Sequence, residues 1–260
     1  MKPPISVTII TKNEADRLPV VLAAVAALSD DVVVVDSGSN DGTQDVARAA
    51  GARVFHRDWT GYGAQKIHAE GLCRHHWVLN LDADEEPSPE MVRSVVDLFR
   101  TGEPPASAYA VAVVPIYPFQ DEGHPWTVYQ RPLRLYRRDR AGFRDDPVHD
   151  SVVVREGGVG RLDGVLIHRS FRSLAHHVEK INDYTTAQAV KWVSEGREPS
   201  FFALLLLPLL AFLKQYFLRR QFVNGVDGIV VSHVYAFQRF LRIAKAREAA
   251  RLARRAERRR

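Results

Sequence analysis

The first hundred residues alternate between short apolar runs and amphipathic segments. Short strand-like runs rich in apolar residues occupy 5–10, 31–36, 53–55 and 76–81, and apolar positions at helical spacing occupy 16–28, 43–50 and 88–100. The run at 31–36, Asp-Val-Val-Val-Val-Asp, is typical of a strand that is buried on both faces of a parallel sheet. Strands that alternate with helices of about ten residues predict a doubly wound α/β sheet.

The pattern changes after Gly102. Four shorter strand-like runs at 109–114, 133–136, 151–155 and 165–167 are separated by turns rich in Pro, Gly and charge. From Phe171 onward the chain has a helical pattern. We therefore predict an α/β domain at 1–170, with halves at 1–105 and 106–170, and a helical region at 171–260.

Residues 201–213 form an uncharged apolar run inside the helical region. Such a helix would extend only ~20 Å, against ~30 Å for the hydrocarbon core of a bilayer. Pro208 would also kink it. The run therefore predicts an interfacial or buried helix rather than a membrane span.

The net charge of +5 is concentrated at the C-terminus. Residues 239–260 contain ten Lys or Arg and two Glu, a net charge of +8, which leaves about −3 for the rest of the chain. Such a tail suits anionic lipid, nucleic acid or no partner at all. No known nucleic-acid motif accompanies it, so we expect no nucleic-acid partner.

Composition sets the broad class. Apolar residues make up 46% of the 260, which is enough for a sizeable core. Cys73 is the single cysteine, so an internal disulfide is excluded and a reducing compartment is favoured. The chain enters its first strand without a signal-peptide pattern, and we expect a cytoplasmic protein.

Acidic and polar residues follow several of the predicted strands. Asp82 and Asp84 end the fourth strand and, being two residues apart, share a face. Carboxylates that close repel unless a cation or hydrogen-bond donors lie between them, and hard oxygen ligands suit Mg²⁺ or Mn²⁺. Asn13 and Glu14 follow the first strand and Asp36 ends the second. All of them fall on the rim where such sheets bind ligands, so we predict a metal that carries a phosphate, against the alternative of a solvated acidic loop.

Three ordered motifs resemble the family 2 glycosyltransferases, which have the GT-A (Rossmann-like) fold with a mixed sheet. The motifs are Val-Thr-Ile-Ile-Thr-Lys-Asn-Glu at 7–14, Val-Val-Val-Asp-Ser-Gly-Ser-Asn-Asp-Gly-Thr at 33–43 and Leu-Asp-Ala-Asp-Glu at 81–85. Later segments resemble the lipopolysaccharide core β-glucosyltransferases of Gram-negative bacteria: Arg-Leu-Tyr-Arg at 134–137, Pro-Val-His-Asp-Ser at 147–151 and Ile-His at 167–168.

The resemblance implies roles for particular residues. The nucleotide sugar would be bound by Thr11, Asn13, Glu14, Asp36, Gly61, Lys66 and Asp82, where Asp36 contacts the base or ribose and the 61–66 segment forms a glycine-containing loop under the sugar and diphosphate. The metal would be held by Asp82, Asp84 and His168, with Asp84 the more direct ligand. Asp150 matches the catalytic base, although near relatives usually have Glu at that position.

Each of these residues has a plainer structural alternative. Asp36 could cap the turn that begins at Ser37, Lys66 and the glycines at 61 and 63 could form an ordinary loop, and His168 could be a structural histidine. Asp150 could lie in a turn or pair with Arg144 or Arg155. Any one of Arg131, Arg134 and Arg137 could contact diphosphate, and Trp126 and Tyr129 could stack on a sugar ring; the sequence does not choose among them.

The resemblance predicts an inverting, metal-dependent glycosyltransferase. It would move a hexose from a nucleotide sugar, a UDP-sugar by preference, to a saccharide hydroxyl in the lipopolysaccharide core or another envelope glycan. The alternatives are a polyprenyl-phosphate sugar synthase and a non-catalytic sugar-nucleotide-binding protein. An apolar segment plus a cationic tail also predicts peripheral binding to an anionic membrane, on the inner face of the inner membrane, for a lipid-linked acceptor. The alternative is a buried helix with a frayed, soluble tail.

Overall fold

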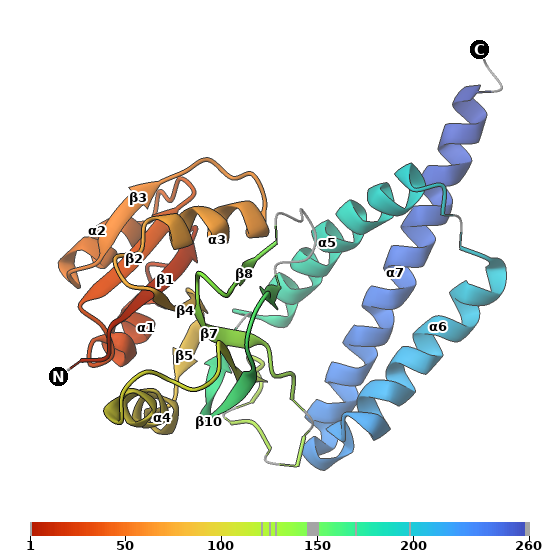
Figure 1. The fold of residues 1–260 in the computed structure, drawn as a ribbon. Coiled ribbons are helices and arrows are strands. Elements are labelled where there is room, and N and C mark those ends of the chain that lie inside the picture. Colours follow the sequence, from red (N-terminus) through yellow and green to blue (C-terminus); the bar gives the residue numbers. More distant parts are fainter. Residues whose placement is uncertain are drawn as a thin grey trace. The chain divides into compact units, whose positions relative to one another are not determined.

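The computed structural model describes residues 2–257 except 121, 125, 128, 145–150, 170 and 198 (Figure 1). Its elements are, in chain order, β1 (Ile5–Thr11), α1 (Leu18–Val25), β2 (Asp31–Asp36), α2 (Thr43–Ala49), β3 (Arg53–His56), α3 (Tyr62–Gly71), β4 (Trp77–Asp82), β5 (Glu85–Pro87), α4 (Pro89–Arg100), β6 (Ala108–Pro115), β7 (Leu133–Arg137), β8 (Ala141–Phe143), β9 (Val152–Val154), β10 (Val159–His168), α5 (Leu174–Ser194), α6 (Phe201–Leu213), a π-helical segment η1 (Lys214–Leu218), a 3₁₀ segment η2 (Gln221–Asn224) and α7 (Gly225–Glu257).

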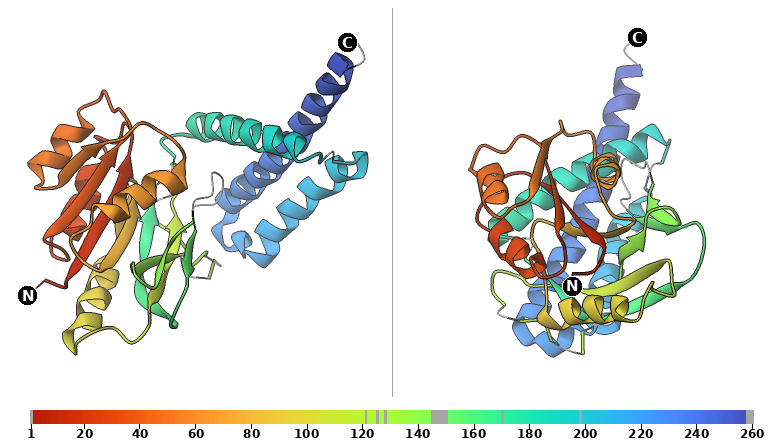
Figure 2. Two further views of the ribbon diagram at one scale, coloured as in Figure 1. Left: turned by 45° about the horizontal axis from the view of Figure 1, so that its top comes forward. Right: turned by 60° about the vertical axis from the view of Figure 1, so that its left-hand side comes forward.

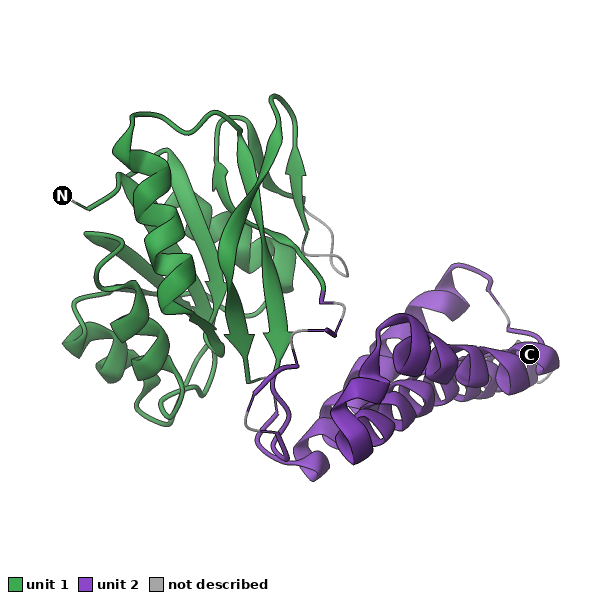
Figure 3. Cartoon of the chain, turned by 90° about the horizontal axis from the view of Figure 1, so that it is seen from below, with its two compact units in different colours: residues 1–115, 130–169 green, residues 116–129, 170–260 purple. Residues whose placement is uncertain are grey.

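The chain forms two compact units (Figure 3). Unit 1 contains residues 1–115 and 130–169, and unit 2 contains residues 116–129 and 170–260. Residues 116–129, which the sequence placed in the second half of the α/β domain, therefore group with the C-terminal helices.

Unit 1 is built on a mixed sheet with the strand order β3-β2-β1-β4-β7-β6-β10-β5. Strands β1 to β4 are parallel, β7 is antiparallel to both β4 and β6, β10 is parallel to β6, and β5 is antiparallel to β10. This arrangement confirms the predicted α/β class.

The β2 run is buried on both faces, as its sequence predicts. Val34 packs with Ile9 in the larger core, which also contains apolar residues of α1, α2 and α4. Val33 and Val35 point the other way and pack with Ala69 of α3 in a separate cluster. Helices therefore cover both faces of the parallel part of the sheet.

The start of α4 is fixed against β10. Ser88 caps the helix by accepting a hydrogen bond from the Met91 amide at 3.2 Å, and Pro89 occupies the first turn, as the sequence predicts. The Val165 amide also donates to Ser88 Oγ, at 3.1 Å. Gly164 is required beside this contact because its φ is +78° and a Cβ there would lie 2.3 Å from the Met91 nitrogen.

Two strands and one helix of unit 1 were not predicted. The segment expected to be a glycine-containing loop becomes helical at Tyr62, with Gly61 before it at φ +119°, so the loop prediction is wrong for 62–66. Strand β5 has the sequence Glu-Glu-Pro, which has no strand signal of its own. It is an edge strand that exists through its pairing with β10. The short β8 pairs with β9.

Unit 2 is helical, as predicted. Figures 1 and 2 show α6 beside the first half of α7 and α5 across its second half. The apolar helix continues through the π-helical segment, so Phe201–Leu218 is 18 residues long and none of that stretch is buried. The buried-helix alternative is therefore wrong. The length argument against a span is also wrong, because 18 residues extend about 27 Å. This is the one stretch in the described part of the chain that is long and apolar enough to cross a membrane.

Candidate active site

The carboxyl ends of three neighbouring parallel strands bring together polar residues that are far apart in sequence. Thr11 of β1 lies opposite Asp36 of β2, and Ile10 of β1 lies opposite Asp82 of β4. Parallel strands end on the same edge of a sheet, so the predicted rim exists. Asn13 and Glu14 follow β1 directly on this rim.

The unpredicted β5 brings Asp84 to His168. Glu85 of β5 lies opposite His168 of β10, and the Arg169 amide donates to the Asp84 carbonyl at 3.1 Å. The Asp84 carboxylate therefore reaches the imidazole, with 3.3 Å between Oδ1 and His168 Nε2. Two of the three residues that the sequence assigned to one metal site are thus in contact.

Asp82 has different partners from Asp84. Lys66 Nζ lies 2.9 Å from Asp82 Oδ1, and Arg134 lies 3.3 Å from Asp82 Oδ2. The Arg134 guanidinium also pairs with Glu85, which is fully buried. Lys66 is 1% exposed and lies over the ring of Phe143. Lys66, Arg134 and Glu85 are therefore buried charged residues, and they meet the partly exposed carboxylate of Asp82.

Burial and pairing shift the ionisation of the acids in opposite directions. Burial alone would raise the pKa of Asp82, but Lys66 and Arg134 outweigh it and hold that pKa well below its usual range. For Glu85, burial is the largest influence and raises its pKa, with Arg134 acting against it. Asp82 is therefore the firmly ionised member of the pair.

The Asp84 carboxylate pairs with two cationic groups. Its other oxygen lies 3.4 Å from the Arg17 guanidinium, opposite the contact with His168. Burial would raise the pKa of Asp84, but the hydrogen bond from His168 together with the charges of His168 and Arg17 outweighs it, and the pKa is lowered. Burial likewise lowers the pKa of His168, and the hydrogen bond and charge of Asp84 reverse this, so that pKa is raised.

Arg17 ties this acid network to the loop after β1. Its Nε donates to Glu14 at 2.7 Å, and its terminal nitrogen donates to the Arg169 carbonyl at 2.5 Å. The Glu14 amide in turn donates to Thr43 Oγ1 at 2.9 Å. Glu14 therefore connects the Asp84 network to the turn after β2.

That turn is held by Asp36. The Asp36 carboxylate accepts hydrogen bonds from the amides of Gly38 and Ser39, each at 3.0 Å, and from Gln44 Nε2 at 2.7 Å. The Ser39 hydroxyl donates to its second oxygen. Asp36 is fully buried, and its contacts are those of the turn-capping alternative.

Asn13 and Gln65 of α3 also form hydrogen bonds with this turn. Asn13 has φ +57°, a left-handed conformation that asparagine tolerates better than most residues. Its amide donates to Ser39 Oγ at 2.8 Å, and its side-chain oxygen accepts from the Asn40 amide at 3.0 Å. Gln65 of α3 donates to Ser37 Oγ at 2.7 Å. Helix α3 thus contacts two parts of the rim: Gln65 contacts the turn, and Lys66 contacts Asp82.

Two buried polar atoms near the strand ends are unsatisfied. Thr11 Oγ1 and Gln65 Oε1 have no hydrogen-bond partner among the residues that the structure describes. Buried polar groups are nearly always paired, so an unpaired one indicates a site for water or a ligand.

Asp150 lies outside the described residues, within 145–150. Its role as a base therefore stays a prediction. Of the three arginines, Arg134 is buried against the acids, whereas Arg137 pairs with Glu103 and Asp139. Contact of any one of the three, Arg131 included, with diphosphate stays a prediction.

The sequence did not single out Arg17 or Glu85. A signal for the Arg134–Glu85 pair was present, because an arginine between Leu133 and Leu135 in a buried strand needs a buried acid. No local signal identified Arg17, whose contact with Asp84 depends on long-range pairing.

The donor set partly fits a divalent ion. No group of three or more His, Cys, Asp or Glu side chains within the described ranges is arranged to hold a metal. The Asp84–His168 pair alone does suit one, since neighbouring ligands of an octahedral ion with bonds of about 2.1 Å lie roughly 3 Å apart. A metal here would need its remaining ligands from a bound molecule.

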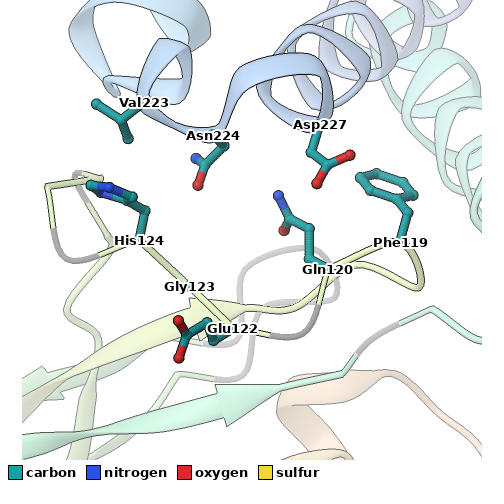
Figure 4. A pocket seen from close by; sticks show the side chains of 8 residues that line it. All are labelled: Phe119, Gln120, Glu122, Gly123, His124, Val223, Asn224 and Asp227. Atoms are coloured by element: carbon teal, nitrogen blue, oxygen red, sulfur yellow. The ribbon is translucent and has the colours of Figure 1, made fainter.

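Unit 2 has a cavity of its own, of about 430 Å³ (Figure 4). It is lined by Phe119, Gln120, Glu122, Gly123, His124, Val223, Asn224 and Asp227. None of the predicted site residues lines it, nor do Trp126 and Tyr129. Trp126 is 69% exposed, and the Tyr129 hydroxyl donates to the His124 carbonyl at 2.8 Å.

Comparison with known proteins decides the family. The model for glycosyl transferase family 2 matches residues 6–156, a stretch that contains every rim residue up to Arg134. The chain belongs to this family. The predictions of a GT-A type architecture and of a glycosyltransferase are thereby confirmed.

Relatives of this family 2 glycosyltransferase cover nearly all of it. It is 38% identical to an uncharacterized glycosyltransferase of Rickettsia typhi, over 94% of this chain and 87% of that one. It is 31% identical to the lipopolysaccharide core biosynthesis glycosyltransferase LpsC of Rhizobium meliloti, over 94% and 92%. A solved glucosyl-3-phosphoglycerate synthase of Mycobacterium tuberculosis, in complex with Mn²⁺, UDP and phosphoglyceric acid, matches at 21% identity and a TM-score of 0.47, over 75% of this chain and 80% of that one.

Proposed function

We propose that this glycosyltransferase transfers a hexose from a nucleotide diphosphate sugar, a UDP-sugar, to a hydroxyl of a saccharide, with a divalent metal and with inversion at the sugar carbon. The acceptor that we propose is the lipopolysaccharide core or another envelope glycan, in line with the name of the relative LpsC. The observation that carries the proposal is the Asp84–His168 pair on the rim, beside the turn that Asp36 holds.

The donor would bind across this rim. Thr11 and Gln65 offer the two unsatisfied buried oxygens, and both residues contact Ser37 at the start of the turn after β2. The loop at Asn13 and Glu14 is ordered by the same turn. Asp36 would act on the nucleotide through the turn that it holds.

Asp84 and His168 would hold the metal, with the diphosphate as the source of further ligands. When bound, Mg²⁺ or Mn²⁺ would supply Lewis-acid stabilisation of the departing diphosphate. Lys66 and Arg134 keep Asp82 ionised beside them and add positive charge near the leaving group.

The acceptor hydroxyl must lose a proton as its oxygen bonds to the sugar carbon and the bond from that carbon to the diphosphate breaks. We assign this proton to the Asp150 carboxylate on the strength of the motif at 147–151, and such a base contributes typically 10²–10⁴-fold. A single displacement of this kind inverts the sugar carbon.

A panel of nucleotide sugars tests the donor proposal. Each sugar is incubated with the full chain, with and without Mn²⁺, and both donor hydrolysis and thermal stabilisation are followed. Metal-dependent hydrolysis of a UDP-hexose is expected. Stabilisation without any hydrolysis would instead indicate a non-catalytic sugar-nucleotide-binding protein.

The Asp150→Asn variant separates the two kinds of acceptor. A hydroxyl acceptor needs the base, so transfer should fall by about a hundredfold or more. A polyprenyl phosphate is already ionised, and an unchanged rate would favour the polyprenyl-phosphate sugar synthase.

For location we propose the cytoplasmic face of the inner membrane. The cationic tail, which continues α7 as far as Glu257, would add attraction to anionic lipid.

A further inference from the structure

Helix α6 and the corner after it expose an unusual amount of apolar surface. Within α6 and the following turns the exposed large side chains are Phe201, Phe202, Leu205, Leu206, Leu207, Leu209, Leu210, Leu213, Phe217, Leu218, Phe222 and Val226. We call residues 201–226 the apolar hairpin segment. The most exposed of these side chains, at Leu218 and Val226, leave more than 70% of their surface uncovered.

The exposed surface is too wide for a single packed stripe. Every residue of α6 is apolar, and only Ala203, Leu204, Pro208, Ala211 and Phe212 are half-buried. The rest of the circumference is open. A helix that is apolar all round is typical of a protein core or of a lipid environment, whereas contact with a second copy would cover one stripe.

The charged residues of the apolar hairpin segment indicate what covers its exposed surface. Residues 199–226 contain three cations and no acid, and all three cations lie at the corner: Lys214, Arg219 and Arg220. Aromatic residues also gather at both ends of α6, with Phe201 and Phe202 at its start and Tyr216, Phe217 and Phe222 at the corner. Aromatic and cationic residues beside an apolar helix are typical of a contact with lipid headgroups.

We propose that the apolar hairpin segment lies flat in one leaflet of an anionic phospholipid bilayer, with α7 on its water side and the corner cations on the lipid phosphates. This proposal specifies which part of the chain makes the membrane contact. Its role in transfer to a lipid-linked acceptor rests on the proposed function. The contact comes from α6 and the corner, and the C-terminal tail is secondary to it.

The contacts between α5 and α7 exclude a span by α6 alone. Such a span would place α5, which precedes α6, and α7, which follows it, on opposite sides of the membrane. Instead Lys245 of α7 donates to Asn182 Oδ1 and Thr186 Oγ1 of α5, both at 2.8 Å. Arg242 of α7 lies 4.4 Å from the ring centre of Trp192. Both helices therefore stay on one side of the bilayer.

Flotation of the full chain with vesicles tests the contact. Vesicles of phosphatidylcholine mixed with phosphatidylglycerol should carry the protein upward at low salt. The double variant Leu209→Gln, Leu210→Gln should partition about tenfold or more weakly. The matched control is Val190→Gln on α5, which is 61% exposed and should float like the wild type.

The corner cations give a second, independent readout. Lys214→Gln with Arg220→Gln should weaken binding to the anionic vesicles by about fivefold per residue and leave binding to pure phosphatidylcholine unchanged. A wild type that stays at the bottom with both kinds of vesicle overturns the proposal. In that case the oligomeric state is measured next. If the wild type is a dimer and the variant Leu209→Gln, Leu210→Gln is a monomer, a second copy of the chain covers the apolar hairpin segment.

Labelling tests the flat orientation. In a Cys73→Ala background, Arg220→Cys should react with a membrane-impermeant maleimide added outside sealed vesicles that carry the protein on their outer surface. Protection of this thiol would overturn the flat orientation in favour of a span. Donor hydrolysis in solution reports the proposed function separately, and the leucine variants should leave it unchanged.

Discussion

The rim of unit 1 and helix α6 of unit 2 deviate from ordinary protein structure in opposite ways. On the rim, charged side chains are buried: Lys66 and Glu85 have almost no exposed surface. On α6, large apolar side chains such as Leu209 and Leu210 are more than half exposed. Buried charge and a broad exposed apolar patch are the observations that most need a reason.

The difference lies in what satisfies each region. Two rim acids have cations from the protein itself, with Lys66 and Arg134 on Asp82 and with Arg17 and His168 on Asp84. The third, Asp36, is held by the backbone amides of its turn and by Gln44. The rim is therefore organised before any ligand arrives. The large side chains of the apolar hairpin segment stay exposed in the described part of unit 2, and the partner that we propose for them is the bilayer. The rim is ordered for binding a ligand, whereas the apolar hairpin segment is proposed to bind a membrane.

The largest effect is expected where the rim would meet the metal. Asp84→Asn should lower metal-dependent donor turnover by about a thousandfold, because a Lewis acid supplies several kcal/mol. The control is Asp45→Asn, a surface acid whose partner Arg48 is also exposed, and it should keep full activity. Full activity of a folded Asp84→Asn enzyme would remove this pair from the metal site.

Replacing Arg134 tests whether the rim is satisfied by its own charges. Arg134→Met would leave Glu85 buried without its cation, at a cost of about 3–5 kcal/mol in the free energy of unfolding. The double variant with Glu85→Leu should recover most of that loss, since the buried carboxylate is then gone and Asp82 keeps its partner Lys66. Urea denaturation measures both. A loss below about 1 kcal/mol in the single variant would mean that Glu85 is protonated and that the pair carries little stability.

The parts of the molecule that local patterning specifies were predictable from sequence. For β2 and for the start of α4, a few residues are enough to predict the structure: the β-branched run in β2 and the Ser88 cap of α4. Strand β5 has no such signal, because two glutamates and a proline become a strand only through pairing with β10. The contact between Asp84 and His168 could be expected from family resemblance, but the route to it through β5 could not.

The site was predictable by position and less so by contact. The strand ends located Asp36, Asp82 and Asp84 on one rim. Which cation reaches which acid depends on long side chains from other elements, and for that reason Arg17 was missed. For Asp36, the sequence left turn capping open, and the contacts found are of that kind.

A third test concerns a buried group in unit 2, where burial is not matched by a charge partner. Burial, with the nearby charges of Lys180 and His176, lowers the pKa of His177 from 6.5 to about 4. The unfolded chain therefore binds more protons between those values, so stability is full above pH 6.5 and is lost as the pH falls toward about 4. The loss from this residue should be about 3 kcal/mol.

His177→Phe isolates that contribution. The ring of His177 stacks on Phe171 with 3.5 Å between centroids, and a phenyl ring fits the same place. Thermal unfolding across this pH range should show a shallower decline for the variant than for the wild type. Parallel curves would contradict the lowered pKa of His177 in the folded protein.

The smallest effect is expected for a leucine truncation on α6, and it compares the two regions directly. Leu79 of β4 is fully buried, and Leu79→Ala should cost about 2–5 kcal/mol in the free energy of unfolding. The same truncation at Leu209, 54% exposed, should change it by no more than about 0.5 kcal/mol in buffer without vesicles, because little of that side chain leaves water on folding. Urea denaturation of both variants gives the ratio directly. A cost at Leu209 near that at Leu79 would show that α6 is already covered in solution. The apolar hairpin segment would then be covered by another part of the protein or by a second copy of it.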